Sequence, residues 1–188
     1  MVNIEEFKEK IKKGLAKPNR YNVNITFPLN SPLIGGNNNS QTLSILCESV
    51  DLPGSLLATN EDQQWGPFRK IPYINIYNDL SLTFMCDEDM FARTVFDTWQ
   101  QNIINKSTFG ISYYDDYIST VNIQLMSQND PNDIIYEVNC FESYPIEVIA
   151  QQLAYENTDT YLKVEVRMAY RYWQDSENSS NSSNSFTF

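Results

Sequence analysis

The sequence predicts a mainly β protein in which two antiparallel sheets form a barrel or sandwich with one central α-helix. Most of the chain between residues 21 and 172 consists of short runs in which apolar and polar residues alternate, which is typical of half-buried strands. One segment near the middle instead repeats its apolar residues every three or four positions, as a helix does. The 188 residues, 41% of them hydrophobic, suit one domain with a substantial core.

The N-terminal segment, residues 1–17, is predicted to be an amphipathic helical arm. Ile4, Phe7, Ile11 and Leu15 share one face of such a helix. Residues 1–20 carry six basic and three acidic side chains, whereas the rest of the chain carries seven basic and 21 acidic ones. We therefore expect the arm to dock on an acidic protein surface, such as the body of another copy, rather than on a membrane.

The domain between residues 18 and 174 is predicted to contain about seven or eight strands. The turn-rich stretch 28–41 separates the first two strands. Asp79 predicts a hairpin between the apolar run at 74–76 and the run at 80–86. The predicted strands lie at 21–27, 43–47, 74–76, 80–86, 121–125, 134–140 and 162–172. The last of these has one apolar and one charged face, which predicts one buried and one hydrated side.

A single helix is predicted from Asp87 to about Ile104. Asp87 is a favourable N-cap, and Glu88 and Asp89 in the first turn complement the helix dipole. The apolar stripe that includes Trp99 predicts packing against a sheet. Residues 175–188 contain six Ser and three Asn, so they are predicted to form a flexible C-terminal tail.

Composition argues against several classes of function. The chain has no histidine, which excludes histidine-based catalysis and histidine-ligated zinc. Its net charge of −11, with nine acidic and no basic residues from 107 to 162, argues against specific nucleic-acid binding. Cys47, Cys86 and Cys140 are widely spaced and predict buried free thiols in a reducing cytoplasm.

No motif for catalysis, a cofactor or a metal emerges, so the protein is predicted not to be an enzyme. Asp115 and Asp116 lie together in an aromatic loop, but they lack the regular ligand spacing of a calcium site. A hydrolase with an acidic cleft is kept as a distant alternative, because a pair of catalytic carboxylates need not be adjacent in sequence. No secretory signal or membrane-spanning run is recognised, so no membrane partner is expected.

Four segments, in this order and spacing, resemble the tail tube protein family of contractile-tailed (myovirus) bacteriophages, which is related to the inner-tube protein of type VI secretion. They are Ala16–Asn19 leading into the first strand, Cys47–Gly54 followed by Arg69–Ile71, Leu80–Met85 followed by the helix ending at Gln100, and Cys140–Pro145 followed by the strand ending at Trp173.

The resemblance implies a structural subunit of the tail tube in the virion, assembled in the cytoplasm of the host bacterium. Hexameric rings would stack head to tail, contact sheath and baseplate proteins, and form a conduit through which genomic DNA passes without specific binding. A baseplate-end protein that initiates the tube, or the inner tube of another contractile injection system, remain alternatives. The contact candidates within and between rings are Phe7, Ile11, Leu52, Pro53, Gly54, Trp65, Arg69 and Lys70.

Overall fold

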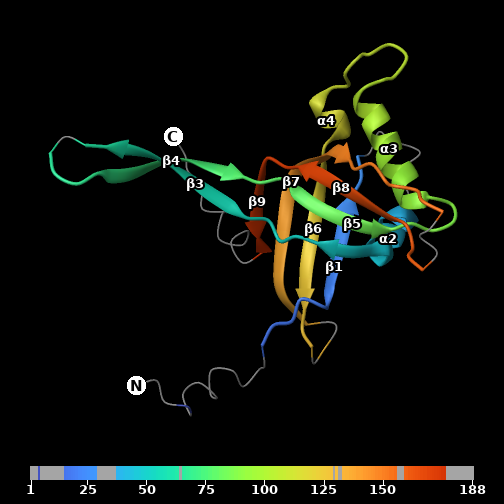
Figure 1. Cartoon of the computed structure of the whole chain (residues 1–188), viewed down its shortest axis with the longest axis horizontal. Coiled ribbons are helices and arrows are strands. Elements are labelled where there is room, and N and C mark those ends of the chain that lie inside the picture. The colour runs from blue at the N-terminus through green and yellow to red at the C-terminus, as the bar shows by residue number, and fades with distance from the viewer. Residues whose placement is uncertain are drawn as a thin grey trace.

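A computed structural model describes residues 4, 15–28, 37–63, 65–128, 130, 133–155 and 159–176 (Figure 1). The predicted N-terminal arm therefore lies almost entirely outside the described residues, and so do Phe7 and Ile11. The same holds for the predicted tail after Ser176.

The described part of the chain is mainly β, as the sequence predicts. Six strands follow one another by hydrogen bonding in the order β1-β6-β7-β8-β5-β2, and β9 pairs with β7 as the seventh strand. A separate two-stranded ribbon pairs β3 with β4. Every pair is antiparallel. The strands are β1 (Tyr21–Thr26), β2 (Cys47–Val50), β3 (Ser55–Asp62), β4 (Arg69–Tyr77), β5 (Leu80–Met85), β6 (Ser119–Met126), β7 (Ile134–Val148), β8 (Lys163–Ala169) and β9 (Tyr172–Asp175). The helices are α2 (Asn37–Leu46), α3 (Phe91–Ile103) and α4 (Tyr114–Tyr117).

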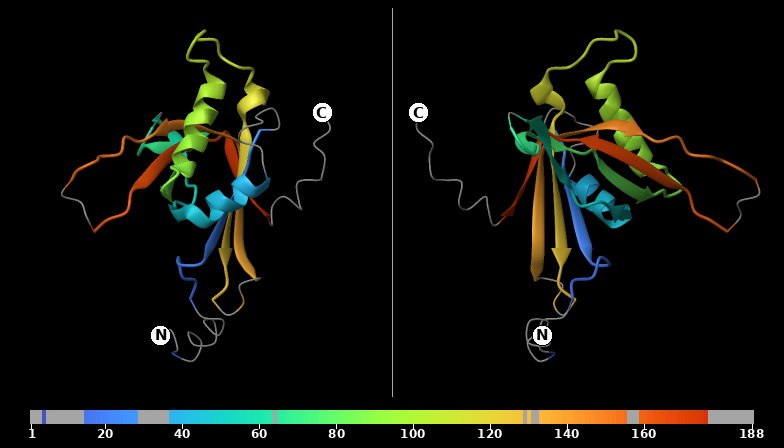
Figure 2. Two further views of the ribbon diagram at one scale, coloured as in Figure 1. Left: turned by 90° about the vertical axis from the view of Figure 1, so that its right-hand side faces the viewer. Right: turned by 60° about the vertical axis from the view of Figure 1, so that its left-hand side comes forward.

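The long strand β7 belongs to both sheets. Its first half pairs with β6 and β9, and its second half pairs with β8. Glu142 lies between the halves with a φ of 55°, a left-handed conformation that is uncommon for a residue with a side chain. The two predicted sheets are thus confirmed and meet at this bend (Figures 1 and 2). The barrel they form is open, because β1 and β2 end the strand order without pairing with each other.

The core lies between the two sheets and beneath α3. Alternate residues of β1, β5, β6, β7 and β8 are buried, as their sequence pattern predicts. Helix α3 buries Ala92, Val95, Phe96 and Trp99, and the indole of Trp99 donates a hydrogen bond of 2.9 Å to the backbone oxygen of Tyr117. Ring contacts then join Trp99 to Phe96 and Phe96 to Phe84 of β5.

The N-terminal end of α3 agrees in part with the prediction. The Asp87 carboxylate accepts a hydrogen bond of 2.8 Å from the backbone N–H of Phe91. The helix itself begins at Phe91, because Met90 adopts a left-handed conformation immediately before it.

The strand predicted at residues 43–47 is wrong, because residues 37–46 form α2. Leu43 is buried, whereas Ile45 is 78% exposed, although an alternating strand would place both on one face. The hydroxyl of Ser40 donates a hydrogen bond of 2.7 Å to the backbone oxygen of Ile25, which holds the helix against β1.

The predicted hairpin at Asp79 is also wrong. Strand β4 pairs with β3, and β5 pairs with β2 and β8. The sequence does not reveal β3, the partner of β4. The second half of β3, Thr59–Asp62, is polar and lacks the apolar alternation of a buried strand.

The predicted closing strand, residues 162–172, is divided into β8 and β9. The division occurs at Arg171, whose backbone N–H donates to Phe141 at 3.0 Å. Because β8 pairs with the second half of β7 and β9 with the first half, the chain changes sheet opposite the bend of β7. The bend of β7 at Glu142 thus coincides with the step from β8 to β9.

Candidate assembly surfaces

The β3–β4 hairpin projects away from the body of the molecule as a two-stranded ribbon (Figure 1). All but one of the side chains in β3, and all but Tyr77 in β4, are exposed. An isolated two-stranded ribbon is marginally stable in water, so this length of hairpin needs support from another surface.

The two faces of the hairpin differ in polarity. Cross-strand pairing places Leu56 opposite Ile76 and Ala58 opposite Ile74, and these residues share one face. A bulge between Ala58 and Thr59 shifts the register by one residue. The apolar face of the hairpin therefore comprises Leu56, Ala58, Ile71, Ile74 and Ile76. A ribbon with one apolar face is typical of a strand pair that is covered on that side.

The sequence-predicted contact residues lie at the two ends of this hairpin. Leu52, Pro53 and Gly54 connect β2 to β3 at its base. Trp65, Arg69 and Lys70 lie at the far end. Trp65 is 96% exposed, and Gly66 beside it has a φ of 86°. The Lys70 ammonium lies 4.0 Å from the Glu61 carboxylate.

Six of the eight predicted contact residues thus lie at the base or at the far end of this hairpin, as two separate groups, while Phe7 and Ile11 lie outside the described residues. The apolar face itself was missed. Its sign in the sequence is the alternation of Ile74 and Ile76, a pattern that is equally typical of a strand in the body of the domain.

The outer face of the sheet formed by β6 and the first half of β7 carries an amide–carboxylate network. The side-chain amide of Asn122 donates to Glu137 at 2.6 Å and to Asn139 at 2.8 Å, and Gln124 donates to Glu137 at 3.0 Å. Hydrogen bonds from Gln124 and Asn122 lower the pKa of the Glu137 carboxyl below its usual value. The ion pairs found among the described residues do not include Glu137, so this face carries uncompensated negative charge.

The outer face of the other sheet differs because it carries two ion pairs. Arg167 of β8 contacts Glu147 of β7 at 3.1 Å, and Lys163 forms an ion pair with Glu48. The Ser81 hydroxyl of β5 donates to Glu165 at 3.3 Å. The two sheets therefore present different surfaces, one with the Glu137 carboxylate held among amides and one with two ion pairs beside the Glu165 carboxylate.

The described residues hold few groups suited to catalysis. Burial raises the pKa of the Cys47 and Cys140 thiols to about 12, which keeps them protonated and poorly nucleophilic at neutral pH. Asp115 and Asp116 lie on the short helix α4. Within the described ranges, His, Cys, Asp and Glu form no group of three that could hold a metal ion. Among the same residues no helix has the length and apolar character needed to cross a membrane.

A family model described as phage tail tube protein matches residues 16–176. The chain belongs to this family, and it is a structural subunit of a tail tube. A comparison with curated proteins gives no match.

Two solved structures, one of a sheath–tube complex and one of a baseplate, contain chains with the same fold. A chain in the cryo-EM sheath–tube complex of the extracellular contractile injection system PVC, in its extended state, is similar with a TM-score of 0.63 and 12% identity, over 89% of this chain and 95% of that one. A chain of the anti-feeding prophage baseplate gives 0.62 and 13%, over 86% and 95%. A crystal structure of an Hcp protein gives 0.46 and 12%, over 86% and 95%.

Proposed function

We propose that six copies of this protein form a ring, and that the rings stack head to tail into the inner tube of a contractile phage tail. The observation that carries this proposal is the apolar face of the β3–β4 hairpin. The described part of the same chain leaves this face exposed. Together with membership of the tail tube family, this face supports association between copies. Leu52, Pro53, Gly54, Trp65, Arg69 and Lys70 at the hairpin ends, with Phe7 and Ile11 of the arm, are the proposed contacts.

The tube is proposed to be the conduit for genome ejection. Six copies at −11 each carry a formal charge of −66 per ring. The amide–carboxylate face of β6 and β7 is the candidate wall of the channel, because like charge repels phosphate and lets DNA slide without binding. Charge, rather than a specific binding site, is the proposed basis of passage.

The proposed partners outside the tube are sheath and baseplate proteins. Solved relatives come from a sheath–tube complex and from a baseplate, so one fold occurs at more than one position of such assemblies. A baseplate-end tube initiator and the inner tube of another contractile injection system are therefore the alternative functions. We place the assembled protein in the virion tail, with assembly in the host cytoplasm and no catalytic activity of its own.

Negative-stain electron microscopy of the purified protein at raised concentration tests the proposal. Rings with a central hole, or tubes of stacked rings, are the expected result. A protein that stays monomeric alone but extends a preformed baseplate would indicate the initiator instead. A protein that assembles under neither condition would contradict the tube function.

A further inference from the structure

Helix α2 lies along the free edge of β1 (Figures 1 and 2). Among the described strands β1 pairs only with β6, and the backbone oxygen of Arg20 accepts a hydrogen bond of 3.0 Å from that strand. Successive residues of an edge strand direct their backbone groups to opposite sides, so the oxygen of Ile25 points away from β6. The Ser40 hydroxyl of α2 donates to this oxygen at 2.7 Å, and the Ser44 hydroxyl donates to the side-chain oxygen of Asn22. Side chains of α2 therefore occupy the edge of β1.

A covered edge matters for association between copies. The sheet β1-β6-β7-β9 ends at β1 on one side and at β9 on the other. Unpaired backbone groups at a sheet edge are a template for a strand of another chain, and a helix that covers the edge prevents such pairing. In the single copy α2 thus stands where a strand of a neighbouring copy would have to pair.

The sequence of α2 favours a helix only weakly. Seven of its ten residues are Asn, Ser, Thr or Ile, which have lower helix propensity than Ala, Leu or Gln. Its first turn has no acidic side chain and its last turn has no basic one, so charge does not complement the helix dipole. The contacts with β1 are therefore an essential part of what keeps this segment helical.

The same residues suit an extended strand. The helix passes into β2 without an intervening turn, because Leu46 ends α2 and Cys47 begins β2. In an extended chain Leu43, Ile45 and Cys47 share one face. In the structure Leu43 and Cys47 are buried, whereas Ile45 is 78% exposed. Extension of residues 42–46 would lengthen β2 beside the end of β5 and bring Ile45 to the buried side.

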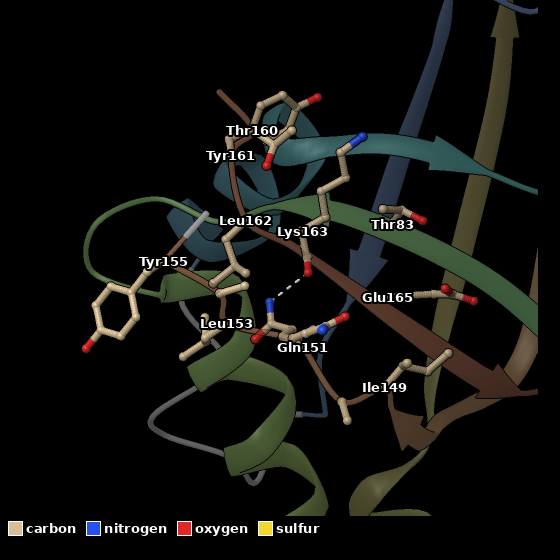
Figure 3. A pocket seen from close by; sticks show the side chains of 13 residues that line it. Thr83, Ile149, Gln151, Leu153, Tyr155, Thr160, Tyr161, Leu162, Lys163 and Glu165 are labelled. Carbon is tan, nitrogen blue, oxygen red and sulfur yellow. Dashed lines mark hydrogen bonds between the residues drawn. The ribbon is translucent and has the colours of Figure 1, made fainter. Parts of the chain in front are cut away.

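Contacts with two other strands hold the start of β2. Glu48 accepts a hydrogen bond of 3.0 Å from Tyr161 and pairs with Lys163, and these two residues line a cavity of about 760 Å³ where the connection from β7 leads into β8 (Figure 3). The Tyr21 hydroxyl of β1 donates to the backbone oxygen of Cys47 at 3.2 Å. The start of β2 is therefore a fixed point from which the preceding residues can extend, and β1 contacts it directly.

We propose that α2 is a removable cover of the β1 edge. It blocks strand pairing in the free subunit, and it converts into an extension of β2 when a second copy pairs with β1. This inference rests on the proposed function, because the competitor for the edge is the neighbouring copy in the ring. Loss of the Ser40 and Ser44 contacts is offset by backbone pairing with the neighbour and by burial of Ile45. The stability of α2 then sets how readily subunits assemble.

A disulfide between α2 and β1 tests whether the helix must leave the edge. Asn22→Cys and Ser44→Cys are combined, because these two side chains are in contact. The background is Cys86→Ser, since Cys86 is only partly buried and serine keeps an acceptor for Gln151. The oxidised protein should need a concentration at least about tenfold higher for assembly than the reduced one. Equal assembly of the two forms would overturn the inference.

A second crosslink in the same background is the matched control. Ser81→Cys and Arg167→Cys lie directly opposite each other on β5 and β8, which stay paired in the proposed change. Oxidation of this variant should leave the concentration needed for assembly unchanged. Mass spectrometry verifies each disulfide, and thermal unfolding verifies that each protein is folded.

Substitutions within α2 test the same inference without crosslinks. Gln41 is exposed, and Gln41→Pro should lower the concentration needed for assembly about tenfold, because proline disfavours a helix interior. Ile45→Ala should raise it severalfold, because alanine favours the helix and removes the side chain that the extended form buries. Gln101→Ala, at an exposed position of α3, should leave it unchanged. Unchanged assembly of both α2 variants would overturn the inference.

Electron microscopy of the unsubstituted protein separates failure of this inference from failure of the tube function. Tubes in which residues 42–46 are extended and β1 pairs with a neighbouring copy are the expected result. Tubes in which residues 37–46 remain helical against β1 would overturn the inference and leave the tube function standing. Absence of any assembly, alone or on a preformed baseplate, would contradict the tube function and this inference with it.

Discussion

Arg171 donates a hydrogen bond of 2.8 Å to the Glu142 carboxylate, and the two residues lie where neighbouring strands change sheet. Glu142 occupies the left-handed bend of β7, and Arg171 occupies the step between β8 and β9. The Tyr114 hydroxyl donates to the same carboxylate at 2.9 Å. Side chains from three separate segments thus hold the shared corner of the two sheets.

The corner at Glu142 and Arg171 predicts that two surface ion pairs contribute differently to thermal stability. Arg171→Ala should lower Tm more than Arg167→Ala, because Arg167 and Glu147 lie opposite each other on β8 and β7, which backbone pairing already joins. Removing Arg171 leaves a bent backbone without one of its side-chain anchors. Thermal unfolding by circular dichroism of both variants measures the difference. Equal shifts in Tm would mean that backbone pairing alone maintains the bend.

The same carboxylate predicts a dependence of stability on pH. The hydrogen bond from Arg171 holds the pKa of Glu142 below its usual value of 4.5. Its contribution to stability is therefore fully present above that value and is lost as pH falls through the lowered pKa of the folded state. Tm measured from about pH 6 down to about pH 3 should fall less steeply for Glu142→Gln than for the unsubstituted protein. Parallel curves would rule out this linkage.

Much of the fold could be predicted from sequence because burial alternates along its strands. Val164, Val166 and Met168 are all buried, as their spacing predicts. The failures occur where local pattern and tertiary contact disagree. Leu43 and Ile45 are spaced as if they shared one face of a strand. In the structure they lie on helix α2, which a hydrogen bond from Ser40 holds against β1.

The candidate site was predictable only in part for the same reason. Trp65, Arg69 and Lys70 could be singled out from the resemblance, but their shared hairpin required knowing that Thr59–Asp62 pairs with β4. The pair Glu142–Arg171 is separated by 29 positions, and nothing in the sequence marks Glu142 as left-handed. A cavity lined by Thr83 of β5, the connection from β7 to β8 and the start of β8 exists only once the folded chain brings these segments together.

The aromatic core under α3 predicts a large loss of stability on truncation. Phe96 is fully buried between Phe84 and Trp99, so Phe96→Ala should cost about 3–5 kcal/mol of unfolding free energy. Phe109→Ala is the matched control, because this phenylalanine is 80% exposed and its loss should change stability by less than about 0.5 kcal/mol. Urea denaturation measures both. A mild effect at Phe96 would mean that neighbouring side chains close the gap.

The thiols predict selective chemical reactivity. Because burial raises the pKa of Cys47 and Cys140 to about 12, a thiol reagent at about pH 8 should leave both unmodified in the native protein. In denaturant all three cysteines should react. Mass spectrometry after proteolysis locates the modified positions. Rapid labelling of Cys140 in the folded state would show that this part of the core opens readily.

The proposed channel wall predicts how added positive charge affects DNA passage. Gln124→Lys and Asn139→Lys place cations on the amide–carboxylate face of β6 and β7, where they would attract phosphate. Phage particles with these tubes should release DNA more slowly than unsubstituted particles, and added salt should reduce the delay. Ser81→Lys is the matched control, because Ser81 lies on the other sheet beside Glu165. Electron microscopy first verifies that every variant forms intact tubes. Slower release with Ser81→Lys alone would mean that the sheet of β5 and β8 lines the channel instead.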